Sequence, residues 1–185
     1  NRWKVYGLGF IGQLDGVILE NWEEIDKVPD DAKLVCSYVD FGYSISKFAS
    51  GNIWKLNNRY IFDELTYSKE MSNPEAAQAM QQNGYVNGTV TYCDYAEPKS
   101  IRELRDAGIN AIKCDSKTDI KDFAIKKLNE DVFYITKRSV NIKSEAKEWV
   151  WNEKTGKPQK SEKDHHMDGI CYGVGSEGKY DGSYY

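Results

Sequence analysis

The chain has 185 residues, of which 40% are hydrophobic and 29% are charged. These proportions exclude a disordered or fibrous chain, and the length is enough for one globular domain with a substantial core. The formal net charge of -4 does not indicate a nucleic-acid-binding protein. A metal site built from carboxylates would itself add negative charge, so partners must be inferred from local patterns.

The cysteines and apolar runs give no sign of a metal knuckle or a membrane partner. The four cysteines are widely separated and form no CxxC pair: Cys36, Cys93, Cys114 and Cys171. We predict buried, reduced thiols of a cytosolic protein. No apolar run approaches the roughly 18 residues of a membrane span. Since the chain begins at Asn1 without a methionine, we expect a fragment of a larger protein.

The first third of the chain predicts short strands. Residues 3–29 combine apolar residues with glycines, a pattern typical of strands joined by tight turns, and an acidic connector follows. The apolar and β-branched run from Leu34 to Val39 predicts a buried strand that ends on Asp40, after which Gly42 allows a turn. A meander is then predicted, with strands over 45–49, 51–56 and 59–66 and turns at Gly51-Asn52 and Asn57-Asn58.

From residue 73 onward the pattern alternates helices and strands. Asn73-Pro74-Glu75 predicts a helix start and Asn83-Gly84 its end. Thr89–Cys93 predicts a strand that also ends on a carboxylate, Asp94. The remaining elements are predicted as a helix over 98–107, a strand over 109–114, a helix over 118–128, a strand over 132–136, a helix over 139–151 capped by Ser139, a lysine-rich loop over 155–163 and a short helix over 165–172 that ends at 173–175.

This order of elements predicts an α/β fold, a mixed sheet flanked by helices. We divide the chain into a connecting segment over residues 1–31, the sheet-containing domain over residues 32–175 and a loose C-terminal tail over residues 176–185. In sheets of this kind, sites form beyond the carboxyl ends of neighbouring strands. Asp40 and Asp94 both lie at such ends.

Three segments offer acids that could converge on one site. They are Asp40, the pair Asp94 and Glu97, and the run Asp164-His-His-Met-Asp168, in which His165 and Asp168 share a helix face. Taken singly, each acid has an ordinary alternative as a turn residue, a helix cap or a solvated charge. Gathered carboxylates repel one another, and divalent cations relieve that repulsion.

Oxygen ligands with open positions suit Mg²⁺ or Mn²⁺. Two such ions about 3.5–4 Å apart can activate a water and stabilise the leaving oxygen in an in-line phosphodiester displacement. The acids therefore predict nuclease chemistry.

Three blocks of the sequence resemble the nuclease domain of tailed-phage large terminase subunits. The blocks are Val39-Asp-Phe-Gly-Tyr43, Tyr92-Cys-Asp-Tyr-Ala-Glu-Pro-Lys-Ser-Ile-Arg-Glu-Leu-Arg105 and Asp164-His-His-Met-Asp-Gly-Ile-Cys-Tyr172. The Asp-x-Ala-Glu-Pro-Lys-Ser-Ile part is the most specific. Because residues 5–9, 16–22 and 149–156 also resemble members of this family, the resemblance covers nearly the whole chain.

The resemblance implies a ribonuclease H-like fold and a metal-dependent endonuclease that cuts concatemeric phage DNA with two Mg²⁺ or Mn²⁺ ions. By motif match, Asp40, Asp94 and Asp168 are the metal-binding triad and His165 is a further catalytic residue. Glu97 and Lys99 lie in the matched block as additional candidates. Many members of the family carry a second acid shortly after the first, where this chain has Ser46.

The resemblance also implies partners and a location. These are double-stranded DNA, the ATPase domain of the same parent chain, the portal and the small terminase subunit, in the host cell cytoplasm and outside the mature virion. No GxxxxGK[ST] motif is present in the chain. DNA contact is predicted at Lys154, Lys157, Lys160 and Lys163, whose alternative is a solvated loop.

Two other functions remain open from the sequence. The chain could be a DNA-holding or docking module with a weak metal site, or another ribonuclease H-like nuclease such as a junction resolvase. His166 is expected to point away from His165 and to serve as its internal control.

Overall fold

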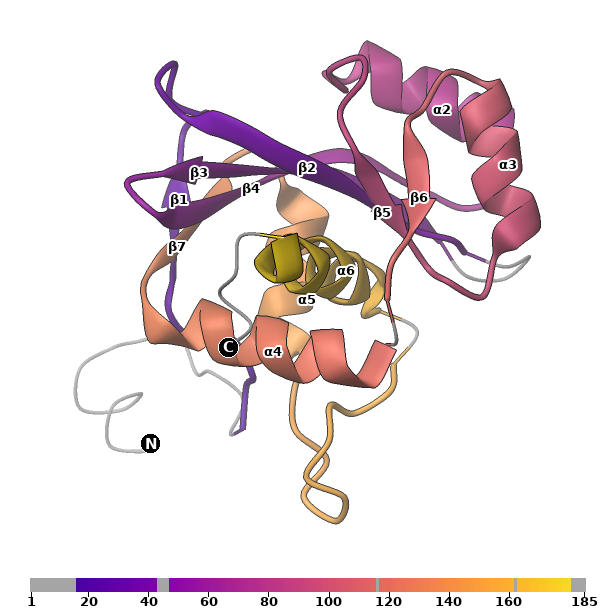
Figure 1. The fold of residues 1–185 in the computed structure, drawn as a ribbon. Coiled ribbons are helices and arrows are strands. Elements are labelled where there is room, and N and C mark those ends of the chain that lie inside the picture. Colours follow the sequence, from indigo (N-terminus) through magenta and orange to yellow (C-terminus); the bar gives the residue numbers. More distant parts are fainter. Residues whose placement is uncertain (1–15, 43–46, 116, 162, 181–185) are drawn as a thin grey trace.

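The computed structural model describes residues 16–42, 47–115, 117–161 and 163–180, although not the side chains of residues 117–119 and 179–180. Within these ranges the strands form one seven-stranded sheet in the order β1-β7-β4-β3-β2-β5-β6 (Figure 1). The strands are β1 Trp22–Ile25, β2 Lys33–Asp40, β3 Phe48–Leu56, β4 Arg59–Ser68, β5 Thr91–Cys93, β6 Ala111–Lys113 and β7 Phe133–Thr136.

The sheet is mixed, as the sequence predicts. β2, β3 and β4 form the antiparallel meander, and β5 and β6 continue it in parallel beyond β2. β7 joins β4 in parallel on the other side, and β1 completes that edge beside β7. Five helices in the described part of the chain cover the two faces: α2 Asn73–Gln82, α3 Pro98–Asp106, α4 Lys117–Glu130, α5 Val140–Glu148 and α6 His165–Tyr180.

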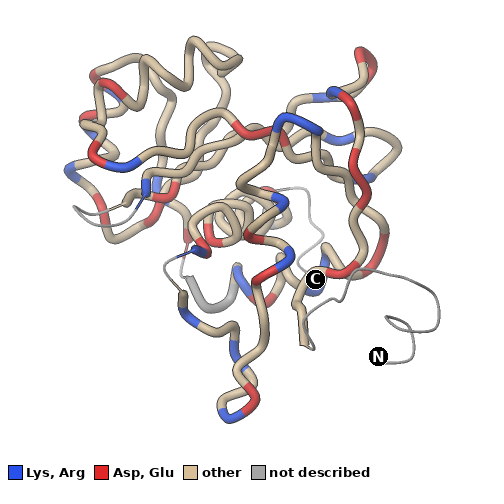
Figure 2. Tube along the Cα trace, turned by 180° about the vertical axis from the view of Figure 1, so that it is seen from behind, with Lys and Arg blue, Asp and Glu red and all other residues tan. Residues whose placement is uncertain are grey.

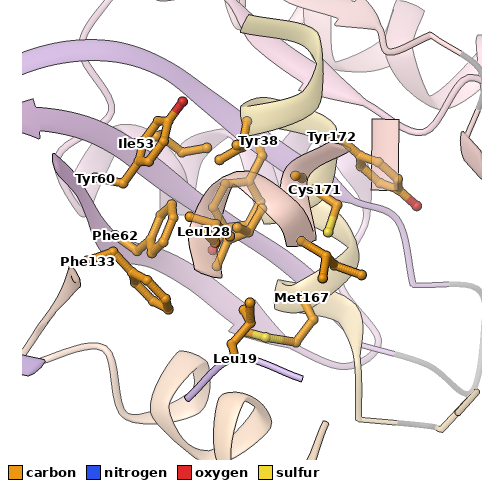
Figure 3. Packing of buried hydrophobic residues seen from close by; sticks show 14 of the residues in the cluster. Leu19, Tyr38, Ile53, Tyr60, Phe62, Leu128, Phe133, Met167, Cys171 and Tyr172 are labelled. Carbon is orange, nitrogen blue, oxygen red and sulfur yellow. The ribbon is translucent and has the colours of Figure 1, made fainter. Parts of the chain in front are cut away.

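Each face of the sheet has its own hydrophobic core. The smaller core lies under α2 and α3, around Val39, Leu65 and Met80. The larger core lies under α4, α5 and α6. Figure 3 shows that Tyr38 and Ile53 from the sheet meet Met167 and Cys171 from α6 in this larger core.

Glycines inside α6 let the helix lie directly on the sheet. A methyl group at Gly169 would overlap the ring of Tyr38, and one at Gly173 would overlap the side chain of Ile53. The prediction that the helix ends at 173–175 is therefore wrong, because these glycines meet a packing requirement and do not cap the helix. The predicted loose tail is also wrong for residues 176–180, which form the last turn of α6 with Ser176 buried.

Two further boundaries differ from prediction for tertiary reasons. Gly51-Asn52 lies inside β3 and not in a turn, because Gly51 leaves room for the Tyr38 hydroxyl. The helix predicted over 139–151 ends at Glu148, and Val150 forms an isolated bridge with Val17. Ser139 occupies the N-cap position but makes no capping bond with its side chain.

Several predicted signals are confirmed. α2 starts at Asn73 as predicted, where the structure adds a capping box from Ser72, Asn57 and Asn58 turn the chain with positive φ, and all four cysteines are buried free thiols. The strands predicted before residue 16 lie outside the described residues. Within the described part, no helix is long and apolar enough to cross a membrane.

Candidate active site

Two of the predicted acids lie side by side at the carboxyl ends of neighbouring strands. β2 and β5 are parallel, and Val39 pairs with Cys93 at the last step of their ladder. Asp40 is the last residue of β2 and Asp94 directly follows β5, so both acids lie where these neighbouring parallel strands end. The apolar strands thus deliver two carboxylates to one edge of the sheet.

Asp40 is 8% exposed, and each of its oxygens has a partner. Oδ2 is 2.8 Å from Nδ1 of His165, and Oδ1 accepts a hydrogen bond of 3.1 Å from the hydroxyl of Tyr172. Burial raises the pKa of Asp40 to about 6; the hydrogen bond from His165 opposes this increase and the charge of Asp168 adds to it. A cation at this position would relieve the cost of the buried charge.

His165 opens α6 and presents its two ring nitrogens to different surroundings. Nδ1 faces Asp40, and this hydrogen bond raises the pKa of His165. Nε2 is buried and has no hydrogen-bond partner among the described residues. Because buried polar atoms are nearly always paired, this nitrogen is suited to bind a metal or to exchange a proton with a ligand.

Asp168 lies on the same face of α6, three residues beyond His165. Its Oδ1 forms a close ion pair with Nζ of Lys121 from α4, and the two side chains are 24% and 23% exposed. The ammonium group also lies over the indole ring of Trp149, 5.3 Å from the ring centroid. Asp168 therefore already has a cationic partner from within the protein.

Tyr172 is a site residue that sequence reasoning missed. It lies one helical turn after Asp168, is 3% exposed and donates its hydroxyl to Asp40. Its pKa is raised far above the usual range because it is buried, and the charges of Asp40, Asp168 and Asp94 add to the increase. The negative charges of all three acids thus raise the pKa of the same tyrosine. The i+4 spacing from Asp168 is the sequence signal that could have found it.

The additional candidates from the matched block lie apart from these contacts. Glu97 precedes α3 and accepts a hydrogen bond of 3.1 Å from the Ser100 hydroxyl. Lys99 has a side chain that is 90% exposed and is 3.7 Å from Glu103. The structure does not bring either residue into a hydrogen bond or ion pair with Asp40 or Asp168. Ser46 lies outside the described residues.

His166 points into the core, opposite to His165. It is fully buried, its Nδ1 is 2.8 Å from the hydroxyl of Tyr38, and its ring stacks on Tyr67. Burial lowers the pKa of His166 to about 3. The expectation that it points away from the site is confirmed. Its use as a neutral control needs correction, because removing a fully buried, hydrogen-bonded ring leaves a cavity and an unpaired hydroxyl.

Two carboxylates, the buried Glu145 and the half-buried Glu64, stabilise the helices that carry the site. Glu145 of α5 is 2% exposed and accepts hydrogen bonds of 2.7 and 3.3 Å from the backbone N–H groups of His166 and Met167. Glu64 of β4 accepts in the same way from the first turn of α5. Carboxylates stabilise helix N-termini. Glu64 of the sheet therefore stabilises the start of α5, and Glu145 of α5 stabilises the start of α6.

The site contains the kinds of donor atom that bind a divalent cation, but the described donors do not lie close enough together to form a complete metal site. Among the described residues, no three His, Cys, Asp or Glu side chains already form a group that could hold a metal ion. The strand-end carboxylates, the Asp168 carboxylate and the partnerless Nε2 of His165 are nevertheless donors that Mg²⁺ and Mn²⁺ accept. In the present arrangement the His165 imidazole is hydrogen-bonded to Asp40, and the Lys121 ammonium group pairs with Asp168.

A projecting loop lies just before α6. Trp151 pairs with Pro158 across it, and the side-chain oxygen of Asn152 accepts hydrogen bonds from the backbone N–H groups of Lys154 and Thr155 in its turn (Figure 1). Lysines recur along this loop, as Figure 2 shows from behind. Lys154, Lys157 and Lys160 are exposed, and Lys163 is 3.1 Å from Glu148.

The antiparallel meander continued by parallel strands, with helices on both faces, defines a ribonuclease H-like nuclease fold. Solved structures with this fold include large terminase nuclease domains from two phages. The domain of bacteriophage P22 is 15% identical, with a TM-score of 0.70 over 86% of this chain and 91% of that one. The g2p nuclease domain of bacteriophage SPP1, solved with bound Mn, is 21% identical, with a TM-score of 0.69 over 88% and 98%.

A longer relative has the same fold in part of its chain. The large terminase of a thermophilic bacteriophage is 20% identical, with a TM-score of 0.67. This chain is covered over 94% of its length and spans about half, 48%, of that large terminase. No protein-family model and no curated protein sequence matches the chain. The chain therefore has the fold of a large terminase nuclease domain.

Proposed function

We propose that this domain is the metal-dependent endonuclease of a viral DNA-packaging motor, which cuts concatemeric phage DNA by two-metal phosphodiester hydrolysis. One observation carries the proposal. Asp40 and Asp94 lie at adjacent parallel strand ends, with His165 and Asp168 of α6 placed against Asp40, in a fold shared with the Mn-bound SPP1 nuclease domain.

Each site residue has a defined task in this proposal. Asp40, Asp94 and Asp168 would hold Mg²⁺ or Mn²⁺, which when bound would supply an activated water and charge stabilisation for the leaving oxygen. Nε2 of His165 holds or moves a proton, because its other nitrogen is fixed by Asp40. Tyr172 orients Asp40 through its hydroxyl.

In this proposal, DNA approaches the site along a surface whose lysines contact the phosphates. The exposed lysines of the 151–163 loop precede α6 in the chain and suit backbone contacts, which carry charge recognition and little sequence preference (Figure 2). The other proposed partners are the ATPase domain of the same parent chain, the portal and the small terminase subunit, in the host cytoplasm. The longer large terminase of the thermophilic bacteriophage, which has also been solved with ADP, supports the ATPase partner.

The decisive experiment is nicking of supercoiled plasmid in millimolar Mn²⁺. The wild-type chain should nick, Asp40→Ala and Asp94→Ala should not, and Asp131→Asn should behave as the wild type because it changes an exposed acid paired with Arg59. Circular dichroism confirms that the inactive variants are folded.

Two results would overturn the proposal. A folded wild-type chain that binds duplex DNA without metal-dependent nicking would favour the DNA-holding module. Strong preference for four-way junctions over linear duplex would favour a junction resolvase of the same fold.

A further inference from the structure

Four acids gather near the start of α6 in the described part of the chain. Asp40 and Asp94 lie at the strand ends, Asp164 and Asp168 lie beside and in the first turn of α6, His165 pairs with Asp40, and Lys121 pairs with Asp168. His165 was expected from the sequence. Lys121 was not, because it lies on a different helix, 47 residues before Asp168.

Lys121 is held in place from two sides. Its ammonium group contacts Oδ1 of Asp168 on α6 and lies over the ring of Trp149, which is itself buried. α4 and α6 run against each other along this contact (Figure 1). A long lysine side chain loses rotamer freedom when fixed in this way, so a solvated helix face does not account for its position.

The contact of Lys121 with Oδ1 of Asp168 opposes metal binding at that oxygen. An ammonium group on a carboxylate oxygen occupies the position from which a divalent ion would bind that oxygen, and two cations within a few ångströms repel strongly in a partly buried site. This agrees with the finding that no metal-ready group of three ligands exists among the described residues.

We infer that Lys121 is an internal cation that competes with the metal for Asp168. Without metal, Lys121 neutralises Asp168 and keeps the first turn of α6 in place. When a divalent ion binds, Asp168 exchanges Lys121 for the ion. Lys121 is therefore a positioning residue that sets how much metal the site needs. This inference rests on the proposed metal-dependent function.

The test is the Mn²⁺ affinity of folded variants, measured from free Mn²⁺ by electron paramagnetic resonance and from the metal-induced rise in melting temperature. Lys121→Met keeps the alkyl chain over Trp149 and removes the charge. It should lower the melting temperature without metal, tighten Mn²⁺ binding about tenfold or more, and enlarge the metal-induced rise. Lys121→Arg should restore wild-type affinity, because it keeps the charge.

Lys126→Met is the matched control, since Lys126 is exposed on the same helix and its replacement changes the net charge by the same amount. It should leave the Mn²⁺ affinity within about twofold. Unchanged or weaker Mn²⁺ binding by Lys121→Met, with a wild type that binds Mn²⁺ through Asp40, would overturn the competition. If neither the wild type nor an Asp40→Ala variant binds Mn²⁺ or changes its melting temperature with Mn²⁺, the metal-dependent function itself would be overturned.

Discussion

The first turn of α6 separates two clusters of similar residues with opposite character. The outer cluster consists of Asp40, His165, Asp168, Lys121 and Tyr172; the inner cluster consists of Tyr38, Glu64, Tyr67, Glu145 and His166. The outer cluster lies at the edge of the sheet and is partly exposed. The inner cluster lies between β2, β4, α5 and α6, where Tyr38, Glu145 and His166 are buried and Glu64 and Tyr67 are half-buried.

Neighbouring histidines show the difference most directly. His165 pairs with a carboxylate, and its pKa is raised. His166 pairs with a hydroxyl, and burial lowers its pKa to about 3. The Glu64 carboxylate lies 3.6 Å from His166 Nε2 but does not offset burial, because its oxygens already accept hydrogen bonds from α5. The outer imidazole is therefore suited to proton transfer, and the inner one stays neutral.

The largest expected effect separates the two histidines. His165→Ala should lower the nicking rate by roughly 10²–10⁴-fold, the usual contribution of a general acid–base group, and should cost about 1 kcal/mol or more of stability because Asp40 loses a hydrogen-bond partner. His166→Ala should instead lower the free energy of unfolding by about 2–4 kcal/mol, because it opens a cavity and orphans the Tyr38 hydroxyl. Nicking per folded molecule and urea unfolding measure the two effects.

His166→Asn, which leaves a smaller polar side chain, tests whether the inner role is one of packing. Equal and small effects of both alanine variants on nicking would remove His165 from the mechanism. The three aspartates would then act through metal alone.

The outer acids could be predicted because their signals are local. Asp40 and Asp94 each terminate an apolar strand, and the resemblance to a known family adds Asp168 and His165. Lys121 gave no such signal, since a lysine on an amphipathic helix usually marks a solvated face. Only the packing of α4 against α6 brings it to Asp168.

The inner cluster could not be predicted because its contacts join distant segments. Glu145 meets His166 across 21 residues, and Glu64 meets Asn141 across 77 residues. The length of α6 was missed for the same reason: Gly173 and Gly175 usually indicate a helix end, but here they face Ile53 and Ile120. Turns and strand ends with local causes, such as Asn57-Asn58, were predicted correctly.

The second expected effect concerns Glu145 and pH. Burial raises the pKa of Glu145 from 4.5 to about 7 in the folded protein. The folded state then binds more protons than the unfolded state between these values, so stability falls as pH rises from about 4.5 to 7. Asp40, raised from 3.8 to about 6, adds a fall in the lower part of this window. Glu145→Gln should remove roughly 3 kcal/mol of this pH dependence.

Urea unfolding between pH 4.5 and 8 measures the change. Glu148→Gln is the control, because Glu148 is a partly exposed glutamate on the same helix that pairs with Lys163. If Glu145→Gln leaves the slope of stability against pH as steep as in the wild type, the raised pKa of Glu145 is not the source of the pH dependence.

The smallest effect compares two tyrosines, one from each cluster. Tyr172→Phe removes a hydroxyl from Asp40, and Tyr38→Phe removes one from His166. Each variant should lose about 1 kcal/mol of stability without metal, the typical contribution of one buried hydrogen bond.

The two losses should then differ in their response to Mn²⁺. A metal ion neutralises Asp40, so it should reduce the loss in Tyr172→Phe, whereas the loss in Tyr38→Phe should stay constant because no ion reaches the inner cluster. Melting curves over a Mn²⁺ series measure both, and losses that shrink equally would show that the two clusters respond to metal as one unit.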